Sequence, residues 1–243
     1  MNRYRNLAFS FPLRSFFGRY PLLFYSFYGL IPKNRMLSVN RNTQLVIEGF
    51  PRSANTFAVV AFNKAQPTKL QIAHHMHVPA QIIKAVQKKI PTIVLIRNPK
   101  DAVVSLVMYD SRISLAQALK CYISFYQTIY IYRAKYVVAR FEEVINNYSN
   151  VIDKTNHKFR TDFITPAHDN LEPKAFFKDI ETIGKIEAIR QGKAEYSELN
   201  VARPSSIRDF LKKELIQRIE RMEYREDLIA AEKIHREFLF CRS

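Results

Sequence analysis

A segment near residue 50 combines the features of an anion-binding loop. The apolar run 45–47 predicts a buried strand, and residues 56–64 predict a helix. Between them, Gly49 opens a sharp loop with the sequence Pro51-Arg52-Ser53-Ala54-Asn55. Backbone N–H groups at a helix N-terminus have no partner within the helix, so they are available to a ligand. A strand, tight loop and helix therefore predict a site for a phosphate or sulfate group.

The same loop differs from the Walker A pattern of ATP-binding proteins at two positions. Gly49 holds the place of the first glycine, and Thr56 holds the place of the final Ser/Thr. Ala54 replaces the second glycine, and Asn55 replaces the lysine that contacts the β- and γ-phosphates. The loop is therefore typical of a phosphate site that has lost its triphosphate chemistry.

A second set of anion-binding residues follows another predicted strand. The apolar run 91–96 ends at Arg97, and Asp101 is expected to cap a helix that carries Ser105. A guanidinium and a hydroxyl placed in this way hold a phosphate by charge and hydrogen bonding. ATP-hydrolysing proteins tend to have a Mg²⁺-organising Asp at such a strand end, so Arg97 favours an anion over a metal. The alternative is a helix-capping turn with a surface arginine.

These residues resemble the motifs of sulfotransferases that use PAPS (3′-phosphoadenosine 5′-phosphosulfate). Residues 49–57 resemble the family's 5′-phosphosulfate loop, and Arg97 to Ser105 resembles its Arg-x₇-Ser motif for the 3′-phosphate. His77-Val78-Pro79 matches the family's His-x-Pro, and Arg140-Phe141-Glu142-Glu143 matches the start of its Tyr-Glu-Asp element. The resemblance covers roughly residues 44–145 and implies a P-loop NTPase-like sulfotransferase fold.

The resemblance implies a role for each matching residue. Arg52 would neutralise the charge that develops on the bridging oxygen as the sulfuryl group leaves. Arg97 and Ser105 would hold the 3′-phosphate, which distinguishes PAPS from ATP. Phe57 and Phe141 are either adenine contacts or ordinary core aromatics. The rest of the cradle would be Pro51, Ser53, Ala54, Asn55 and Thr56. The family's C-terminal Arg-Lys-Gly element is absent, and Arg203, with Ser205 and Arg208 nearby, is the candidate substitute.

His77 is the predicted general base, because an acceptor hydroxyl loses a proton as it attacks sulfur and histidine titrates near neutrality. In an extended chain His75 and His77 would lie on one face and His74 on the other, which makes His75 the reserve candidate. A metal site is the rival interpretation of three clustered histidines, but sulfuryl transfer needs no metal. No metal is therefore expected.

The elements that would position these residues alternate between strand and helix. Strands are predicted at 45–47, from residue 70 towards 77, at 91–96 and at 136–139, with helices at 79–88 and 115–135 between and after them. This order predicts an α/β fold, a three-layer parallel sheet flanked by helices, with the site beyond the carboxyl ends of the strands. A long charged helix is expected from Ser205 or Ser206 towards Phe238, packing through Phe210, Leu211, Leu215, Ile219 and Met222.

Composition narrows the class of protein further. The 243 residues fit one α/β domain with additions, and a formal charge of +16 implies anionic partners. Two cysteines, Cys121 and Cys241, are too few for a disulfide scaffold or a Cys-rich zinc site, and they favour a reducing compartment.

Residues 1–43 form a basic, aromatic N-terminal arm with seven Lys/Arg and no acidic residue. The apolar run 20–31 is too short to span a bilayer and lacks a signal-peptide cleavage site. The arm is expected to pack on the core. The alternatives are a peripheral membrane contact and a wall of the acceptor pocket.

The sequence thus predicts an N-terminal arm (1–43) and a cytoplasmic sulfotransferase domain (44–243) that binds PAPS and releases PAP, its desulfated product. The acceptor would be a hydroxyl or amine of a small molecule, lipid or carbohydrate, and no nucleic acid is expected. Two alternatives stay open: an ATP-dependent P-loop phosphotransferase, and a non-catalytic basic protein that binds nucleic acid or anionic lipid through residues 1–43.

Overall fold

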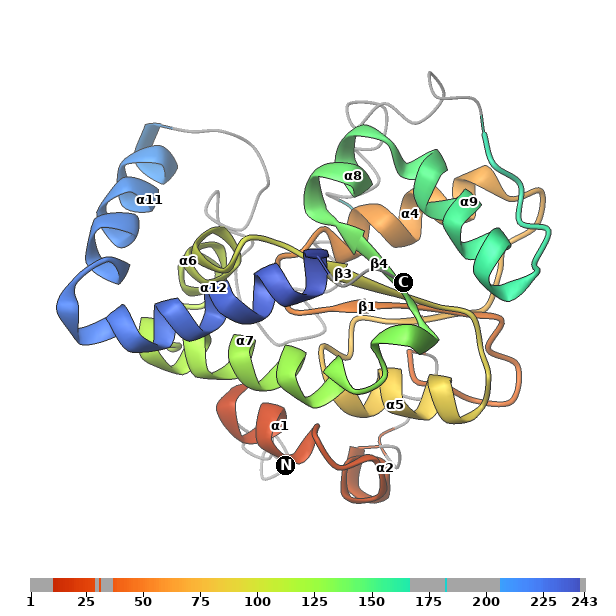
Figure 1. Ribbon diagram of the computed structural model, residues 1–243, viewed down its shortest axis with the longest axis horizontal. Coiled ribbons are helices and arrows are strands. Elements are labelled where there is room, and N and C mark those ends of the chain that lie inside the picture. The colour runs from red at the N-terminus through yellow and green to blue at the C-terminus, as the bar shows by residue number, and fades with distance from the viewer. Residues whose placement is uncertain (1–10, 29–30, 32–36, 167–181, 183–205, 241–243) are drawn as a thin grey trace, which may run out of the picture.

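The computed structural model describes residues 11–28, 31, 37–166, 182 and 206–240. Its centre is a four-stranded parallel sheet with the order β2-β1-β3-β4 (Figure 1). The strands are β1 (Leu45–Gly49), β2 (Ile72–His74), β3 (Thr92–Ile96) and β4 (Val137–Arg140). The predicted α/β class with a parallel sheet is confirmed.

Helices cover both faces of this sheet, which gives the three predicted layers (Figure 1). One face is covered by α4 (Asn55–Ala65), α8 (Phe141–Asn146) and α9 (Tyr148–Phe159), and the other by α5 (Pro79–Gln87) and α7 (Leu115–Tyr130). Two further helices, α6 (Pro99–Tyr109) and α12 (Arg225–Phe240), pack on α7, and α11 (Ser206–Ile219) packs on α6.

Alternating side chains of the strands divide the core between the two faces. Ile47, Ile93 and Leu95 pack with α4, α8 and α9, whereas Val94 and Ile96 belong to the cluster formed with α6, α7 and α12. Successive side chains of a strand point to opposite faces, so a strand buried on both sides needs apolar residues throughout. This requirement explains the nearly uninterrupted apolar runs, with buried Glu48 as the exception in β1.

Two helices have other ends than the sequence predicts. The helix expected at 115–135 ends at Tyr130 and is followed by a 3₁₀ turn, Arg133–Lys135. This turn brings Tyr136 into the core, where its hydroxyl donates to the carbonyl oxygen of Ile129 at 2.9 Å. The cap of α6 also differs: Asn98 Oδ1 accepts the backbone N–H groups of Lys100 and Asp101, so Asp101 lies inside the helix.

The single C-terminal helix expected to run towards Phe238 is two helices. Arg221 is extended between α11 and the 3₁₀ turn Met222–Tyr224, and α12 then begins at Arg225. The break allows Ile219 of α11 and Phe238 of α12 to pack in the same core. Phe210 and Met222 were also expected to pack, but they are 67% and 77% exposed.

The N-terminal arm contains α1 (Phe11–Phe17) and α2 (Pro21–Tyr28), which pack against α7 and α5 (Figure 1). Phe24 is fully buried against Met76 and Val78. At the turn between the helices, a Cβ on Gly18 would lie 2.5 Å from Val78 Cγ1, so only glycine fits. This is the packing arrangement expected for the arm. Within the described ranges, no helix has the length and apolar character needed to cross a membrane.

Candidate active site

The loop after β1 is a tight turn that leads directly into α4. Asn55 Nδ2 donates to the carbonyl oxygen of Phe50 at 3.1 Å, which closes the loop across its base. Arg52 and Ala54 have φ angles of 69° and 68°, in the left-handed region that favours glycine. Gly49 lies so close to β3 that a Cβ would meet the Leu95 carbonyl oxygen at 2.6 Å. Close strand packing and two left-handed residues therefore set the shape of the loop.

Several polar groups of this loop have no hydrogen-bond partner among the described residues. The first turn of α4 has no side-chain cap and no acidic residue. Ser53 Oγ and Asn55 Oδ1 are buried without a hydrogen-bond partner in the described part of the chain. The hydroxyl of Tyr126 lies beside Ser53, but it donates to the Leu95 carbonyl oxygen at 2.8 Å. Since buried polar atoms are rarely left unpaired, both atoms fit a ligand at the loop. The Ser53 hydroxyl and the N–H groups at the start of α4 can donate to an anion, whereas Asn55 Oδ1 only accepts and would face a donor group.

Arg52 joins this loop to the second predicted motif. Its Nε donates to Ser105 Oγ at 3.1 Å, and its guanidinium carbon lies 5.0 Å from the centre of the Tyr109 ring. Ser105 and Tyr109 are four residues apart on α6 and therefore share one face of that helix. Two motifs that are 53 residues apart in sequence thus meet through a direct hydrogen bond.

Arg97 makes the second connection between the motifs. Its Nη1 donates to the carbonyl oxygen of Arg52 at 3.0 Å, and its guanidinium carbon lies 4.1 Å from the centre of the Phe141 ring. Asp101 Oδ1 is 4.0 Å from Arg97 Nη2, and Tyr122 donates to the Arg97 carbonyl oxygen at 2.8 Å. Aromatic stacking and these bonds hold the guanidinium plane in a defined orientation.

The topology explains why these residues meet. In the order β2-β1-β3-β4, the chain leaves β1 towards β2 and later returns to the other side of β1 as β3. Ligands in open α/β sheets bind at such a switch point, beyond the carboxyl ends of the strands. Arg52 follows β1 and Arg97 follows β3, so the bond between them spans this position.

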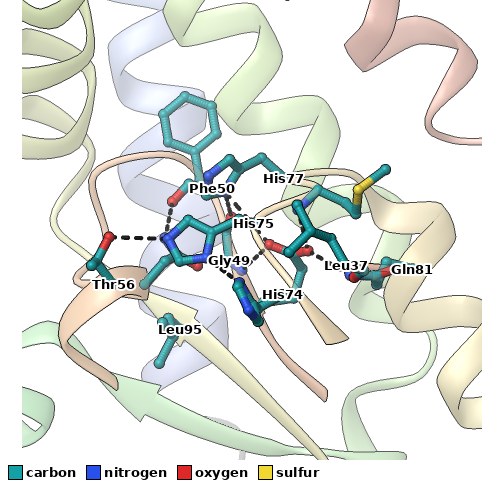
Figure 2. Close-up of polar contacts among 12 residues, drawn as sticks. Leu37, Gly49, Phe50, Thr56, His74, His75, His77, Gln81 and Leu95 are labelled. Atoms are coloured by element: carbon teal, nitrogen blue, oxygen red, sulfur yellow. Dashed lines mark hydrogen bonds and ion pairs between the residues drawn. The ribbon is translucent and has the colours of Figure 1, made fainter. Parts of the chain in front are cut away.

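The three histidines form a compact turn after β2 and not the predicted extension of the strand. β2 ends at His74, and His75 and His77 have φ angles of 58° and 51°. The ring of His75 lies 4.6 Å from that of His74 and 5.6 Å from that of His77, both edge to face (Figure 2). The predicted separation of His74 from the other two is therefore wrong, because the chain turns where it was expected to stay extended.

This histidine turn contacts both ends of the loop (Figure 2). His77 Nδ1 donates to the carbonyl oxygen of Gly49 at 2.9 Å, and His75 Nε2 is hydrogen-bonded to Thr56 Oγ1 at 3.0 Å. His75 is buried and also bonded to His74, whereas the side chain of His77 is 16% exposed. His75 therefore supports the loop, and His77 is the histidine better placed to receive a proton.

Burial controls the protonation of this site. It lowers the pKa of His77 well below the usual value, and the neighbouring His75, Arg14 and His74 lower it further. His77 is therefore a neutral imidazole at pH 7, as a base requires.

Sequence reasoning missed Glu48, which lies beneath the histidine turn. Burial raises its pKa to about 7, although hydrogen bonds from neighbouring backbone N–H groups and Gln81 oppose this shift. The sequence did contain a signal for Glu48, because it is a single acid at the end of an apolar predicted strand. Burying a carboxylate costs free energy unless the group is paired, so such a residue is often functional. Tyr109 and Tyr122, which contact Arg52 and Arg97, carried no such signal.

The other predicted site residues have different surroundings. Phe57 is buried in the core, where it packs with the residues of α4 and α9 and its ring lies 6.2 Å from that of Tyr148. Pro51 is buried in the loop, and Arg203 lies outside the described residues. Within the described ranges, no three His, Cys, Asp or Glu side chains are arranged to hold a metal ion. The site therefore offers two permanent positive charges from Arg52 and Arg97, the N–H groups at the start of α4, and the neutral imidazole of His77.

No protein-family model and no curated protein matches the chain. Among solved structures, the chain is similar to mouse sulfotransferase SULT7A1, solved as a complex with PAP. The TM-score is 0.43 at 11% sequence identity, and the match covers 88% of this chain and 91% of the mouse chain.

Proposed function

We propose that the protein is a PAPS-dependent sulfotransferase, which moves a sulfuryl group from PAPS to a hydroxyl or amine of an acceptor and releases PAP. The proposal combines the sequence motifs with the site that their residues form. The acceptor is a small molecule, lipid or carbohydrate.

The observation that carries the proposal is the direct contact between the two motifs. Arg52 bonds to Ser105, and Arg97 bonds to the backbone of Arg52, at the switch point of the sheet. A nucleotide with anionic groups at both its 5′ and 3′ ends needs two neighbouring anion sites of this kind. A triphosphate site would instead have a lysine in place of Asn55 and a magnesium-organising Asp at the strand end, where this chain has Arg97.

In the proposed reaction, the acceptor oxygen attacks sulfur with a lone pair. The bond between sulfur and the bridging oxygen of the 5′-phosphate breaks, and its electrons stay on that oxygen. Arg52 neutralises the resulting charge and, as a permanent cation, donates no proton. The acceptor proton goes to Nε2 of His77, because Nδ1 already carries the proton that is donated to Gly49.

Calorimetric titration with PAP in metal-free buffer tests the proposal, with AMP and ATP as competing ligands. PAP is expected to bind much more tightly than AMP, because only PAP has the 3′-phosphate. Arg97→Ala should weaken PAP binding sharply and leave AMP binding almost unchanged. Arg112→Ala is the matched control, since it removes one surface guanidinium that is paired with Asp110 and does not contact the loop.

Three results would contradict the proposal. ATP binding that is tighter than PAP binding and requires Mg²⁺ would favour phosphoryl transfer. Equal loss of PAP affinity in Arg97→Ala and Arg112→Ala would indicate non-specific attraction to a basic protein. A preparation that binds PAP but transfers no sulfuryl group from PAPS to any screened hydroxyl or amine would favour a binding protein.

We also propose that the N-terminal arm brings the protein to an anionic membrane surface. Five large apolar side chains of α1, α2 and the turn between them are exposed: Leu13, Phe16, Tyr20, Leu22 and Leu23. Arg19 lies over the Phe16 ring at 5.5 Å, and no acidic residue precedes Glu48. Exposed apolar groups together with a segment that carries basic and no acidic residues fit an anionic interface.

A further inference from the structure

Glu48 is a buried carboxylate that the proposed reaction does not yet use. It lies in the middle strand pair of the sheet and is 0% exposed. Its Oε2 accepts the backbone N–H of Met76 at 2.9 Å and Gln81 Nε2 at 3.2 Å, and its Oε1 accepts the N–H of Gly49 at 3.2 Å. These bonds join β1, the histidine turn and α5 at one carboxylate.

The same carboxylate faces the ring of His77. Glu48 Oε1 lies 3.5 Å from His77 Nδ1, the atom that donates to the Gly49 carbonyl oxygen. A carbonyl oxygen only accepts, so Nδ1 carries the proton and Nε2 holds the lone pair. Two acceptors on one side of the ring therefore select a single tautomer, the one in which Nε2 is the basic nitrogen.

We propose that Glu48 is a positioning residue for His77, which holds the ring with Nε2 as the base and balances the positive charge that the ring gains with the acceptor proton. The role in turnover rests on the proposed sulfotransferase function. The role in selecting the tautomer does not.

The surroundings of His77 show why a carboxylate is needed there. His74 and His75 of the same turn and Arg14 of α1 all oppose a positive charge on the ring. Burial opposes it as well, so an imidazolium would be strongly disfavoured without an anion close to it. Glu48 supplies that anion from β1. The proton moves only from the acceptor oxygen to Nε2, and Glu48 keeps its own protonation state during the step.

Gln81 holds Glu48 in place and connects it to the N-terminal arm. Gln81 is buried, and its Nε2 also donates to the Leu37 carbonyl oxygen at 3.0 Å (Figure 2). Its Oε1 accepts from Val39 N and from Tyr25 Oη, each at 3.2 Å. The carboxylate is thus fixed from the side opposite to His77.

Kinetics of Glu48→Gln test the role in turnover, with PAPS and an acceptor found by screening the wild type. The substitution keeps the size of the side chain and removes its charge. We expect kcat to fall roughly 10- to 100-fold with PAP affinity unchanged, as for other residues that orient a catalytic group. Asp153→Asn on α9 is the control for loss of one carboxylate, and it should leave kcat unchanged.

A double-variant comparison separates positioning from general damage to the fold. If Glu48 acts through His77, Glu48→Gln should have no further effect on the residual rate of His77→Ala. The wild-type rate should also rise with pH around pH 7, as the buried carboxylate ionises, and this rise should be absent in Glu48→Gln. Independent losses from the two substitutions, or the same pH profile in both proteins, would overturn the proposal.

Nitrogen-15 NMR of the histidine rings tests the tautomer without any reaction. In the wild type, His77 should be protonated at Nδ1 below and above pH 7, and in Glu48→Gln its pKa should fall further. A wild-type His77 protonated at Nε2 would overturn the proposal even if the variant does not fold. If no PAP binding or transfer is found, the sulfotransferase assignment fails while the NMR result still decides the role of Glu48.

Discussion

Arg97 is held in a way that suits a guanidinium and not an ammonium group. It donates to the Arg52 carbonyl oxygen and stacks on Phe141, and both contacts use the planar shape of the side chain. Charge alone would not orient the group towards a phosphate. Substitution by lysine therefore separates the contribution of shape from that of charge.

For Arg97→Lys we expect the dissociation constant of PAP to rise roughly tenfold, because the charge stays while one charge-assisted hydrogen bond and the stacking are lost. Calorimetric titration measures the change. Phe141→Leu should give a smaller loss, since it removes only the stacking partner. If the lysine variant binds PAP as tightly as the wild type, Arg97 acts only through its charge.

Replacement of each histidine should give a different kinetic pattern. His77→Ala is expected to lower kcat roughly 10²- to 10⁴-fold, as loss of a general base does, without weakening PAP binding. His75→Ala should weaken PAP binding, because Thr56 at the start of α4 loses its partner. Exposed His157 on α9 supplies the control, His157→Ala. If His75→Ala lowered kcat without weakening PAP binding, His75 would be the base in place of His77.

The buried Glu48 carboxylate should affect stability in a pH-dependent way. Its pKa is about 7 in the folded protein and close to 4.5 in the unfolded chain, so the folded state binds more protons between these values. Stability is therefore lost as pH rises from about 4.5 to 7, by roughly 3 kcal/mol from this group alone. His77 acts in the opposite direction, because its lowered pKa costs stability as pH falls below 6.5.

Comparison of Glu48→Gln with the wild type isolates the carboxylate. The free energy of unfolding of the wild type, minus that of the variant, should fall as pH rises from 5 to 8. Urea unfolding at a series of pH values measures both free energies. A constant difference would mean that Glu48 titrates as an ordinary exposed acid.

At the scale of the element, the loop between β1 and α4 contains backbone strain at Ala54. Ala54 has a φ angle of 68° at the N-cap of α4, where the family pattern has glycine. The left-handed conformation costs an alanine about 1–2 kcal/mol of folding free energy. Glycine adopts this conformation without that cost, but it also makes the unfolded chain more flexible, which offsets part of the gain.

Ala54→Gly should therefore stabilise the protein by roughly 0.5–1 kcal/mol, which corresponds to a rise in Tm of about 2–4 °C per kcal/mol. Thermal unfolding followed by circular dichroism measures this shift. Ala58→Gly is the matched control: Ala58 is buried within α4, where glycine costs about 1 kcal/mol. Destabilisation by both substitutions would show that the left-handed conformation at Ala54 carries no strain.

At the scale of the whole molecule, α1 and α2 lie on the side of α5 and α7 away from the sheet (Figure 1), and both helices carry exposed apolar side chains. α2 contains no charged residue, and one of its sides is buried through Phe24 while Leu22 is 87% exposed. The helix is thus apolar on a side that the described protein does not cover.

Vesicle co-sedimentation tests the proposed membrane contact. The protein should bind vesicles that contain phosphatidylserine, bind phosphatidylcholine vesicles weakly, and dissociate as salt is raised. The double variant Leu22→Ser/Leu23→Ser should bind roughly tenfold less, because two apolar side chains are lost from the interface. Phe210→Ser is the control, since Phe210 is exposed on α11, at another side of the molecule from α1 and α2. Equal binding by all three proteins would refute the contact.

The amino-acid sequence by itself determined the α/β class, the order of strands and helices, and the two motifs that are proposed to bind anions. These features are local: apolar runs bounded by turns, and polar residues at the strand ends. Their meeting at one edge of the sheet also follows from the sequence, because parallel strands place their carboxyl ends together. The pairing of Arg52 with Ser105 and the stacking of Arg97 on Phe141 do not, because they depend on where α6 and α8 pack.

Only the tertiary structure decided the shape of the histidine turn, the division of the C-terminal helix and the place of Glu48. The turn forms because Glu48 of β1 accepts the N–H of Met76, a contact between residues 28 positions apart. The C-terminal helix divides where Ile219 and Phe238 reach one core from two directions. Such long-range contacts override local periodicity, since the free energy of burying a side chain or satisfying a carboxylate exceeds the small preference of one residue for helix or strand.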